Sequence, residues 1–327
     1  MKNSSIYYSV GPLLYCPANR ETIAPSLIGQ KFGDSFSLAL CLEDTIGDSH
    51  VEEAERCLAN SIRQIRCALE HTSFYLPKIF IRVRCPQQIM RMVRLLGDSQ
   101  ELLSGFIIPK FSPENADAYI QQMITANEFL ARRLYLMPIY ESVCIIDLRS
   151  RFDVLYTLKE KLSRVEELVL NIRVGGNDLC HLFSFRRHAW ESIHRIRPIA
   201  DIFSAIMAVY GMDYVVSGAV WEYYSGYGWR EGLINELADD RLCGLIGKTV
   251  IHPNQIDVVN DACRVTQKDY DDARSILHWD SDSAYAVSAS PARERMNEHK
   301  THTNWARQTL YLAERYGIKP CQERIAR

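Results

Sequence analysis

Short apolar runs that each end in a charged or polar residue recur along this chain, and they alternate with segments of helical periodicity. The pattern is clearest at residues 168–178, where an apolar run leads through a Gly-Gly turn to a single carboxylate, Asp178. The other residues that end such runs are Arg20, Glu43, Asp44, Arg82, Lys110, Glu141 and His252. Strands that alternate with helices favour a parallel sheet, because each return to the same end of the sheet needs a crossover connection.

Eight strands are expected, which is the number that closes a barrel. They lie at residues 13–17, 36–42, 79–84, 105–110, 134–141, 168–174, 213–217 and 245–251. Helices are expected between them at residues 50–69, 115–132, 153–165, 198–210 and 229–242. We therefore predict an α/β fold, a (β/α)8 TIM barrel, whose active site lies where the carboxyl ends of the strands meet.

The pattern changes after His252. Helices are expected at residues 256–263, 268–278 and 293–316, with a polar linker rich in small residues at 280–291. The 327 residues are enough for a barrel and one extension, since a barrel of this type takes about 250 residues. We divide the chain into the barrel, residues 1–264, and a C-terminal helical extension, residues 265–327, which is expected to cover its own active site or a neighbour's.

The amino-acid composition argues against a nucleic-acid or membrane partner. The 38 basic and 40 acidic residues give a net charge of -2, which favours neither nucleic acid nor a membrane surface. No apolar run approaches the length of about 18 residues that a membrane span needs, and the first residues lack the apolar core of a signal peptide. The ten cysteines form no C-x-x-C pair, a pattern typical of reduced thiols. We expect a cytoplasmic protein without a nucleic-acid or membrane partner.

Glu141 and Asp178 end consecutive strands, the fifth and the sixth, so a barrel places them side by side. Two carboxylates at that separation suit Mg²⁺, which prefers oxygen ligands and keeps several waters. The alternative is that each carboxylate pairs with an arginine or caps the following helix.

Arg82 lies inside an otherwise apolar strand, and a buried guanidinium needs anionic or hydrogen-bonding partners. It is suited to bind a substrate carboxylate through two hydrogen bonds, or to form a structural pair with Glu43 or Asp44. Strand alternation puts Arg84 on the same face, unless it turns toward another loop. Lys110 either binds an acidic group or is a solvent-exposed lysine.

The segment at residues 221–229 has five aromatic residues in nine positions and follows the seventh strand. Aromatic side chains on a loop at the barrel mouth can stack on a planar ring such as a nucleobase. The alternative is that they pack against the extension or form an oligomer contact.

Seven segments in chain order resemble motifs of the aldolase/citrate lyase beta-subunit superfamily of (β/α)8 barrels. Residues 14–20, 40–46, 81–84, 107–110, 138–142, 176–179 and 247–255 are similar, in that order, to F-V-P-G-N-R, D-L-E-D-A-V, V-R-V-N, V-L-P-K, P-L-I-E-T, G-x-E-D-L and G-K-x-x-I-H-P-x-Q. Each motif is short, but all seven fall at expected strand ends and keep their order.

The resemblance implies a Mg²⁺-dependent carbon–carbon lyase or aldolase that acts on a 2-oxo or 3-hydroxy acid, free or as an acyl-CoA thioester, through a metal-stabilised enolate. It implies Glu141 and Asp178 as metal ligands. The catalytic residues that it implies are Arg82, Glu43 and Asp44. It implies that Asn19 and Arg20 line the mouth. We also expect Arg84, Lys110, Gly176 and Asn177 to bind the substrate. The small-molecule acid is the expected partner, and self-association as a trimer or a multiple of a trimer is also implied.

The chain departs from the family pattern at several positions. Cys41 replaces the first acid of D-L-E-D, Arg84 replaces the asparagine of V-R-V-N, and the tail from Asp280 does not match. Two alternatives follow: a divergent member that acts on a phosphorylated or nucleoside-like substrate, or a non-catalytic subunit that binds a metal or ligand.

Overall fold

Eight parallel strands form one closed sheet in the computed structural model, which describes residues 3–280 and 285–319. The strands are β1 Pro12–Pro17, β2 Ser37–Cys41, β3 Lys78–Arg82, β4 Leu103–Ile108, β5 Tyr135–Tyr140, β6 Ile172–Val174, β7 Val216–Ser217 and β8 Lys248–Val250. Their order is β7-β6-β5-β4-β3-β2-β1-β8, and a parallel bridge from Gly218 to Lys248 joins the two ends. The predicted barrel is confirmed.

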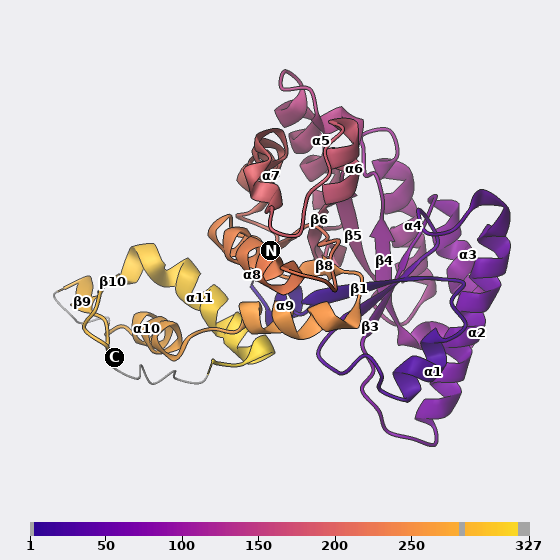
Figure 1. Cartoon of the computed structure of the whole chain (residues 1–327), viewed down its shortest axis with the longest axis horizontal. Coiled ribbons are helices and arrows are strands. Elements are labelled where there is room, and N and C mark those ends of the chain that lie inside the picture. The colour runs from indigo at the N-terminus through magenta and orange to yellow at the C-terminus, as the bar shows by residue number, and fades with distance from the viewer. Residues whose placement is uncertain (1–2, 281–284, 320–327) are drawn as a thin grey trace.

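Helices surround the sheet (Figure 1). They are α1 Ile23–Ile28, α2 Val51–Leu69, α3 Gln87–Leu96, α4 Ala116–Phe129, α5 Arg151–Ser163, α6 Gly176–Leu182, α7 Arg197–Tyr210 and α8 Trp229–Leu242. Helix α2 shows why they form: Leu58, Ile62 and Ile65 recur at helical spacing and are buried, while the opposite face is charged. Helices α1 and α3 were not expected from the sequence. No helix in the described ranges is long and apolar enough to cross a bilayer.

Apolar side chains fill the barrel interior at its amino-terminal end. Leu13, Phe80 and Ile107 belong to a buried cluster formed by alternate residues of the strands. Ile6 and Tyr7, from the 3-10 helix Ser5–Tyr8, pack against this cluster from below. The interior is therefore packed at the amino-terminal end, and the mouth lies at the carboxyl ends of the strands, as in other barrels of this type.

A buried ion cluster lies where the barrel closes. Lys248 Nζ on β8 lies 2.9 Å from Oε1 of Glu236 and 2.7 Å from Oδ2 of Asp240, both on α8. Asp240 also lies 2.7 Å from Nε2 of His194, and Arg187 pairs with Glu236. Burial by itself raises the pKa of Asp240, but Lys248 and His194 reverse the shift and lower it. The cluster connects β8 to the helix that precedes it.

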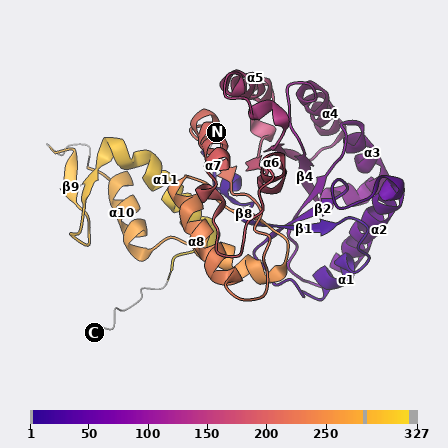
Figure 2. The same cartoon turned by 45° about the horizontal axis from the view of Figure 1, so that its top comes forward.

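The C-terminal extension projects to one side of the barrel (Figures 1 and 2). It follows α9 Ile256–Cys263 and contains α10 Gln267–Leu277, β9 Val287–Ala289, β10 Met296–Glu298 and α11 His299–Tyr316. The prediction of a linker is wrong for residues 287–289, which pair antiparallel with 296–298. The last helix begins at His299, six residues later than predicted, because residues 296–298 form strand β10 and not the first turn of the helix. The linker residues 281–284 lie outside the described part of the chain.

Helix α11 contacts the barrel through its last two turns. The rings of Tyr311 and Tyr8 stack with their centroids 5.4 Å apart, and Tyr316 Oη donates a hydrogen bond to the carbonyl of Tyr8. Arg315 Nε donates to the carbonyl of Ser5 over 3.1 Å. These partners precede β1, so this contact lies at the amino-terminal end of the barrel, remote from the chain's own mouth. Coverage of a neighbouring subunit's site stays a prediction.

Candidate active site

Arg82 connects three strand ends at the mouth. It is the last residue of β3, and its Nη2 lies 2.7 Å from Oε2 of Glu43, 2.9 Å from Oδ2 of Asp44 and 3.2 Å from Oε1 of Glu141. Glu43 and Asp44 follow β2, and Glu141 directly follows β5. The guanidinium thus has carboxylate partners, as a buried cation requires. The pairing expected from the sequence with Glu43 and Asp44 is confirmed, and Glu141 is a further partner.

Lys110 joins the same cluster from the turn after β4. Its Nζ pairs with Glu43 and lies 3.0 Å from Oδ1 of Asp44, while its backbone N–H donates to Oε1 of Glu141 over 3.1 Å. Its φ of +46° is rare for a residue with a Cβ. This turn lets one residue direct its backbone toward Glu141 and its side chain toward Glu43, and backbone strain of this kind is concentrated at functional sites.

Asp178 reaches Glu141 from α6. The Asp178 carboxylate lies near enough to Glu141 to raise the pKa of the Glu141 carboxyl group. Space for the Glu141 side chain exists because the facing residue is Gly175, where a Cβ would lie 2.2 Å from Glu141 Oε2. Burial raises the pKa of Glu141 to about 7, since the nearby carboxylate of Asp178 adds to the effect of burial and the charge of Arg82 only partly opposes it.

The Glu141–Asp178 pair fits a Mg²⁺ ion. Two neighbouring carboxylates repel one another when both are ionised, and a divalent cation between them removes that repulsion. Glu141 Oε1 is already hydrogen-bonded by Arg82 and Lys110, so its other oxygen is the one available as a ligand. Oxygen donors from two carboxylates, with waters completing the shell, are the usual set for this ion.

Glu43 and Asp44 titrate differently although they are adjacent. The pKa of Glu43 is raised, because burial outweighs the opposing charge of Arg82. The pKa of Asp44 is lowered, because hydrogen bonding with Glu43 and the charges of Arg82 and Lys110 outweigh its partial burial. Paired carboxyls whose environments separate their pKa values in this way are suited to proton transfer.

The remaining predicted residues lie around this cluster. Asn19 and Arg20 follow β1 and are exposed, and Arg20 Nε donates to Oγ1 of Thr22 over 3.1 Å. Gly176 and Asn177 begin α6, next to Asp178. The structure places these residues at strand ends on the mouth side of the barrel, and their contact with a substrate stays a prediction.

Arg84 has partners in the loop after β2. Its guanidinium donates to the carbonyls of Leu42 and Ile46 over 2.7 and 2.6 Å, and to Oδ1 of Asp48 over 2.6 Å. Because β3 ends at Arg82, the strand alternation expected from the sequence does not extend to Arg84. The side chain holds the loop that carries Glu43 and Asp44, and its role as a substrate ligand stays a prediction.

The aromatic segment after β7 is packed at its beginning and exposed near its end. Trp221 is 1% exposed, and the Arg187 guanidinium lies over its ring, 5.2 Å from the centroid. Tyr224 stacks on His252 with ring centroids 4.6 Å apart. Tyr227, by contrast, is 97% exposed. Packing within the barrel therefore accounts for much of this segment, and stacking on a ligand ring stays a prediction for its exposed part.

Two interior residues at the mouth were missed by the sequence analysis. Arg173 on β6 is 1% exposed, and its Nη2 donates to Oγ1 of Thr249 over 2.6 Å. Tyr15 on β1 lies with its ring centroid 5.9 Å from Cζ of Arg82. The signal for Arg173 was available, because it is a charged residue inside an apolar strand, as Arg82 is.

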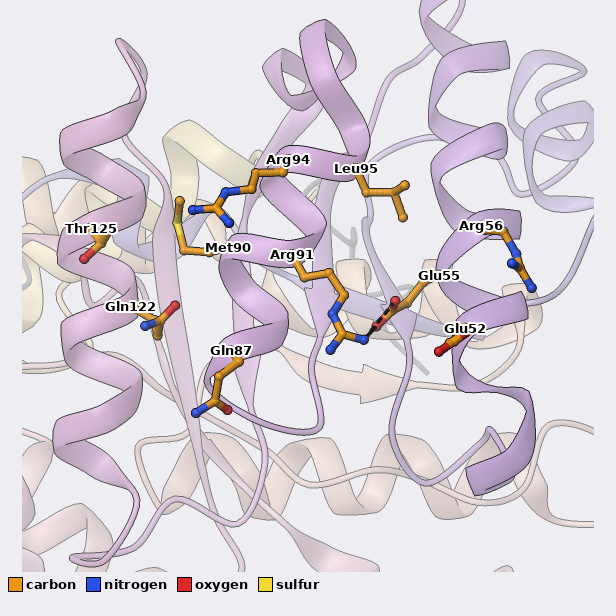
Figure 3. Close-up of a pocket in the computed structure, with 10 residues that line it drawn as sticks. All are labelled: Glu52, Glu55, Arg56, Gln87, Met90, Arg91, Arg94, Leu95, Gln122 and Thr125. Atoms are coloured by element: carbon orange, nitrogen blue, oxygen red, sulfur yellow. Dashed lines mark hydrogen bonds and ion pairs between the residues drawn. The ribbon is translucent and has the colours of Figure 1, made fainter.

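Two other features lie away from the mouth. A hollow of about 870 Å³ opens between α2, α3 and α4, and in it Arg91 points toward the buried carboxylate of Glu55 (Figure 3). Cys67, Glu70 and His71, at the end of α2, have ligand atoms within 4.8 Å of one another and are exposed. Both features belong to the outer helices and not to the strand ends, so neither forms part of this site.

Several solved structures share the fold. The protein CitE of Mycobacterium tuberculosis, in complex with magnesium, acetoacetate and coenzyme A, has a TM-score of 0.59 at 18% identity, covering 94% of this chain and 99% of its own. The citrate lyase beta subunit of M. tuberculosis, complexed with oxaloacetate and magnesium, has a TM-score of 0.51 at 18% identity over 79% and 98% of the two chains. RipC of Yersinia pestis has a TM-score of 0.53 at 16% identity over 78% and 95%. The sequence matches none of the curated proteins with which it was compared.

The family model described as C–C bond lyase of the TIM-barrel fold matches residues 4–318, nearly the whole chain. This protein belongs to that family of carbon–carbon bond lyases.

Proposed function

We propose that this protein is a Mg²⁺-dependent lyase or aldolase that breaks or forms a carbon–carbon bond in a 2-oxo or 3-hydroxy acid. The observation that carries the proposal is that the Glu141 and Asp178 carboxyl groups are neighbours, beside Arg82, at the carboxyl ends of the strands. The magnesium complexes of CitE and of the citrate lyase beta subunit, with acetoacetate and with oxaloacetate, support it.

Glu141 and Asp178 would hold the ion. Bound there, Mg²⁺ would supply Lewis-acid stabilisation for charge that develops on the substrate oxygens. Arg82 contributes a fixed positive charge at the same place, and its buried Nε has no hydrogen-bond partner among the described residues. That N–H is a donor for a substrate oxygen, and its use by a ligand would remove the cost of an unpaired buried donor.

Glu43 is the group that we assign to proton transfer. Its raised pKa favours a proton on the carboxyl group, while the neighbouring Asp44 and Lys110 stay charged. A carboxyl whose pKa is moved toward neutrality can both give and take a proton at the operating pH. Asp44 and Lys110 would hold Glu43 in place, since both contact it directly.

Calorimetric titration tests the proposal. Mg²⁺ is titrated into the protein with pyruvate, glyoxylate or oxaloacetate, and then into Glu141→Gln and Asp178→Asn. Each variant is expected to weaken metal binding by about tenfold or more, as the loss of one ionic ligand implies. Glu55→Gln, a buried carboxylate on an outer helix, is the matched control and should leave binding unchanged. Failure of the wild type to bind Mg²⁺ with any of these acids would refute the proposal.

We also propose that the substrate can be presented as a coenzyme A thioester and that the chain self-associates as a trimer or a multiple of a trimer. The CitE complex with coenzyme A, whose likeness covers 94% of this chain, supports the first of these. Adding coenzyme A to the titration above checks for a thioester site. Light scattering measures the molar mass, and a monomer at working concentration would contradict the second.

A further inference from the structure

The end of α2 carries three exposed side chains of metal-binding type, outside the candidate active site. They are Cys67, Glu70 and His71, and each offers a donor atom within 4.8 Å of the other two. The backbone N–H groups of Glu70 and His71 donate to the carbonyls of Cys67 and Ala68 over 3.2 and 3.1 Å, so the helical winding continues through His71. Residues three and four positions apart share one face of such a turn, which explains why the three side chains converge.

The donor atoms of these three side chains are not used by other residues. No hydrogen bond or ion pair of the Cys67, Glu70 or His71 side chain is found within residues 3–280 and 285–319. An exposed histidine elsewhere on the surface, His188, instead contacts the carboxylate of Glu191 over 3.0 Å. A thiol, a carboxylate and an imidazole are therefore free to take up one ligand at the same place.

The surroundings of the three donors favour a cation. They lie at the carboxyl end of α2, where the helix dipole is negative and the last carbonyls have no partner in the next turn. The adjacent positive charge, Arg66, is paired with Glu101, its Nε lying 2.6 Å from Oε1. Helix α2 leads into the first residue of β3, so this place is at the amino-terminal end of the barrel, opposite the mouth that holds Glu141 and Asp178.

We propose that Cys67, Glu70 and His71 form a second metal site, which binds one Zn²⁺ ion with water as the fourth ligand. A thiolate and an imidazole select zinc over Mg²⁺, which takes oxygen ligands. The donor atoms of a tetrahedral zinc site lie about 3.5 Å apart, so side-chain movements of about 1 Å close the site, and exposed side chains can make them. Binding forms a Zn–S bond and releases the thiol proton to solvent, and no electron is transferred.

Titration with Co²⁺, a coloured ion that takes the same tetrahedral sites, tests this in reduced protein without an affinity tag. The wild type should develop a thiolate-to-cobalt absorption band that saturates at one equivalent, and Zn²⁺ should remove the band by displacing Co²⁺. Cys67→Ser should abolish the band. Glu70→Gln and His71→Ala should keep it at saturation but raise the half-saturating Co²⁺ concentration about tenfold or more, because each loses one ligand. Cys243→Ser, which removes another exposed thiol, is the matched control and should leave the titration unchanged.

Thermal unfolding gives a second readout. In the Glu141→Gln variant, whose proposed Mg²⁺ site is impaired, Zn²⁺ should still raise the unfolding temperature, because the ion binds a site that only the folded helix end provides. Adding Cys67→Ser to that variant should remove most of the rise. Absence of the thiolate band from the wild type, its survival in Cys67→Ser, or an unchanged titration in His71→Ala would overturn the assignment. None of these results bears on Mg²⁺ binding at the mouth, so the two metal sites are tested separately.

Discussion

The carboxylate of Glu141 occupies space that is available only because residue 175 has no side chain. A Cβ on Gly175 would lie 2.2 Å from Oε2 and 2.3 Å from Cβ of Glu141. The backbone of Gly175, with φ of -92°, is one that any residue can adopt. Glycine is therefore required here for close approach and not for its conformation. The turn before α6 and the end of β5 therefore pack directly against each other at Gly175 and Glu141.

Replacement of Gly175 tests whether Glu141 needs the space that this glycine leaves. Gly175→Ala is expected to displace the Glu141 side chain and to weaken Mg²⁺ binding by about tenfold or more, because one ligand leaves its place. Calorimetric titration measures the change. Gly47→Ala is the matched control, since a Cβ there would meet only an ordinary contact at 3.8 Å. Unchanged Mg²⁺ affinity in Gly175→Ala would show that Glu141 is not a ligand.

Removal of the Arg82 charge should destabilise the mouth. Arg82→Gln leaves Glu43, Asp44 and Glu141 without their shared cation, and the loss of one partner of a buried ion pair costs about 3–5 kcal/mol. Thermal or urea unfolding measures the loss of stability. Mg²⁺ should recover part of it, because the ion replaces some of the missing positive charge. Arg91→Gln, whose guanidinium is 3.4 Å from Glu55 and half exposed, should cost about 1 kcal/mol or less.

The ion cluster at the barrel closure should give a distinct acid sensitivity. Because the pKa of Asp240 is lowered in the folded state, its contribution to stability is present above the unfolded value of about 4 and is lost as the pH falls through the folded value. Asp240→Asn should lower stability at pH 7 and should remove this part of the acid-dependent loss. Urea unfolding of both proteins between pH 7 and pH 3 measures the two slopes. Parallel slopes would contradict the assignment of the lowered pKa to Asp240.

The docking of α11 should depend on its tyrosine stack. Tyr311→Ala removes the ring that stacks on Tyr8 and should release the end of α11, at a cost of about 2–4 kcal/mol for a partly buried aromatic ring. Limited proteolysis should then cut within the extension before the barrel is cut. Tyr311→Phe keeps the stack and loses only the hydrogen bond to the carbonyl of Asn3, so it should remain resistant. Equal cleavage of both variants would assign the docking to that hydrogen bond.

Strand ends were easier to predict from the sequence than the interior of the mouth. Glu43, Arg82 and Glu141 could be named because each charge ends or interrupts an apolar run, and parallel strands bring such ends together. Their pairing geometry could not be predicted, because it depends on the stagger of the strands and on the turn at Lys110. Arg173 was missed although it is a charged residue inside an apolar strand, and its partner Thr249 on β8, 76 positions away in the chain, could not be predicted.

The hairpin of β9 and β10 was missed for a different reason. Its strands have three residues each, too few to show the alternation by which a strand is recognised. Small and polar residues at 287–289 are typical of loops, and only pairing with 296–298 makes them a strand.

Helix α11 contacts the residues before β1, and the two segments are synthesised far apart in time. Tyr8 is synthesised before its partner Tyr316, which follows 308 residues later. At translation rates of roughly 5–20 residues per second, that interval is on the order of 15–60 s. Throughout it, the segment Ser5–Tyr8 is present without the helix that holds it against the barrel. The amino-terminal end of the barrel therefore reaches its final form only after α11 has been synthesised.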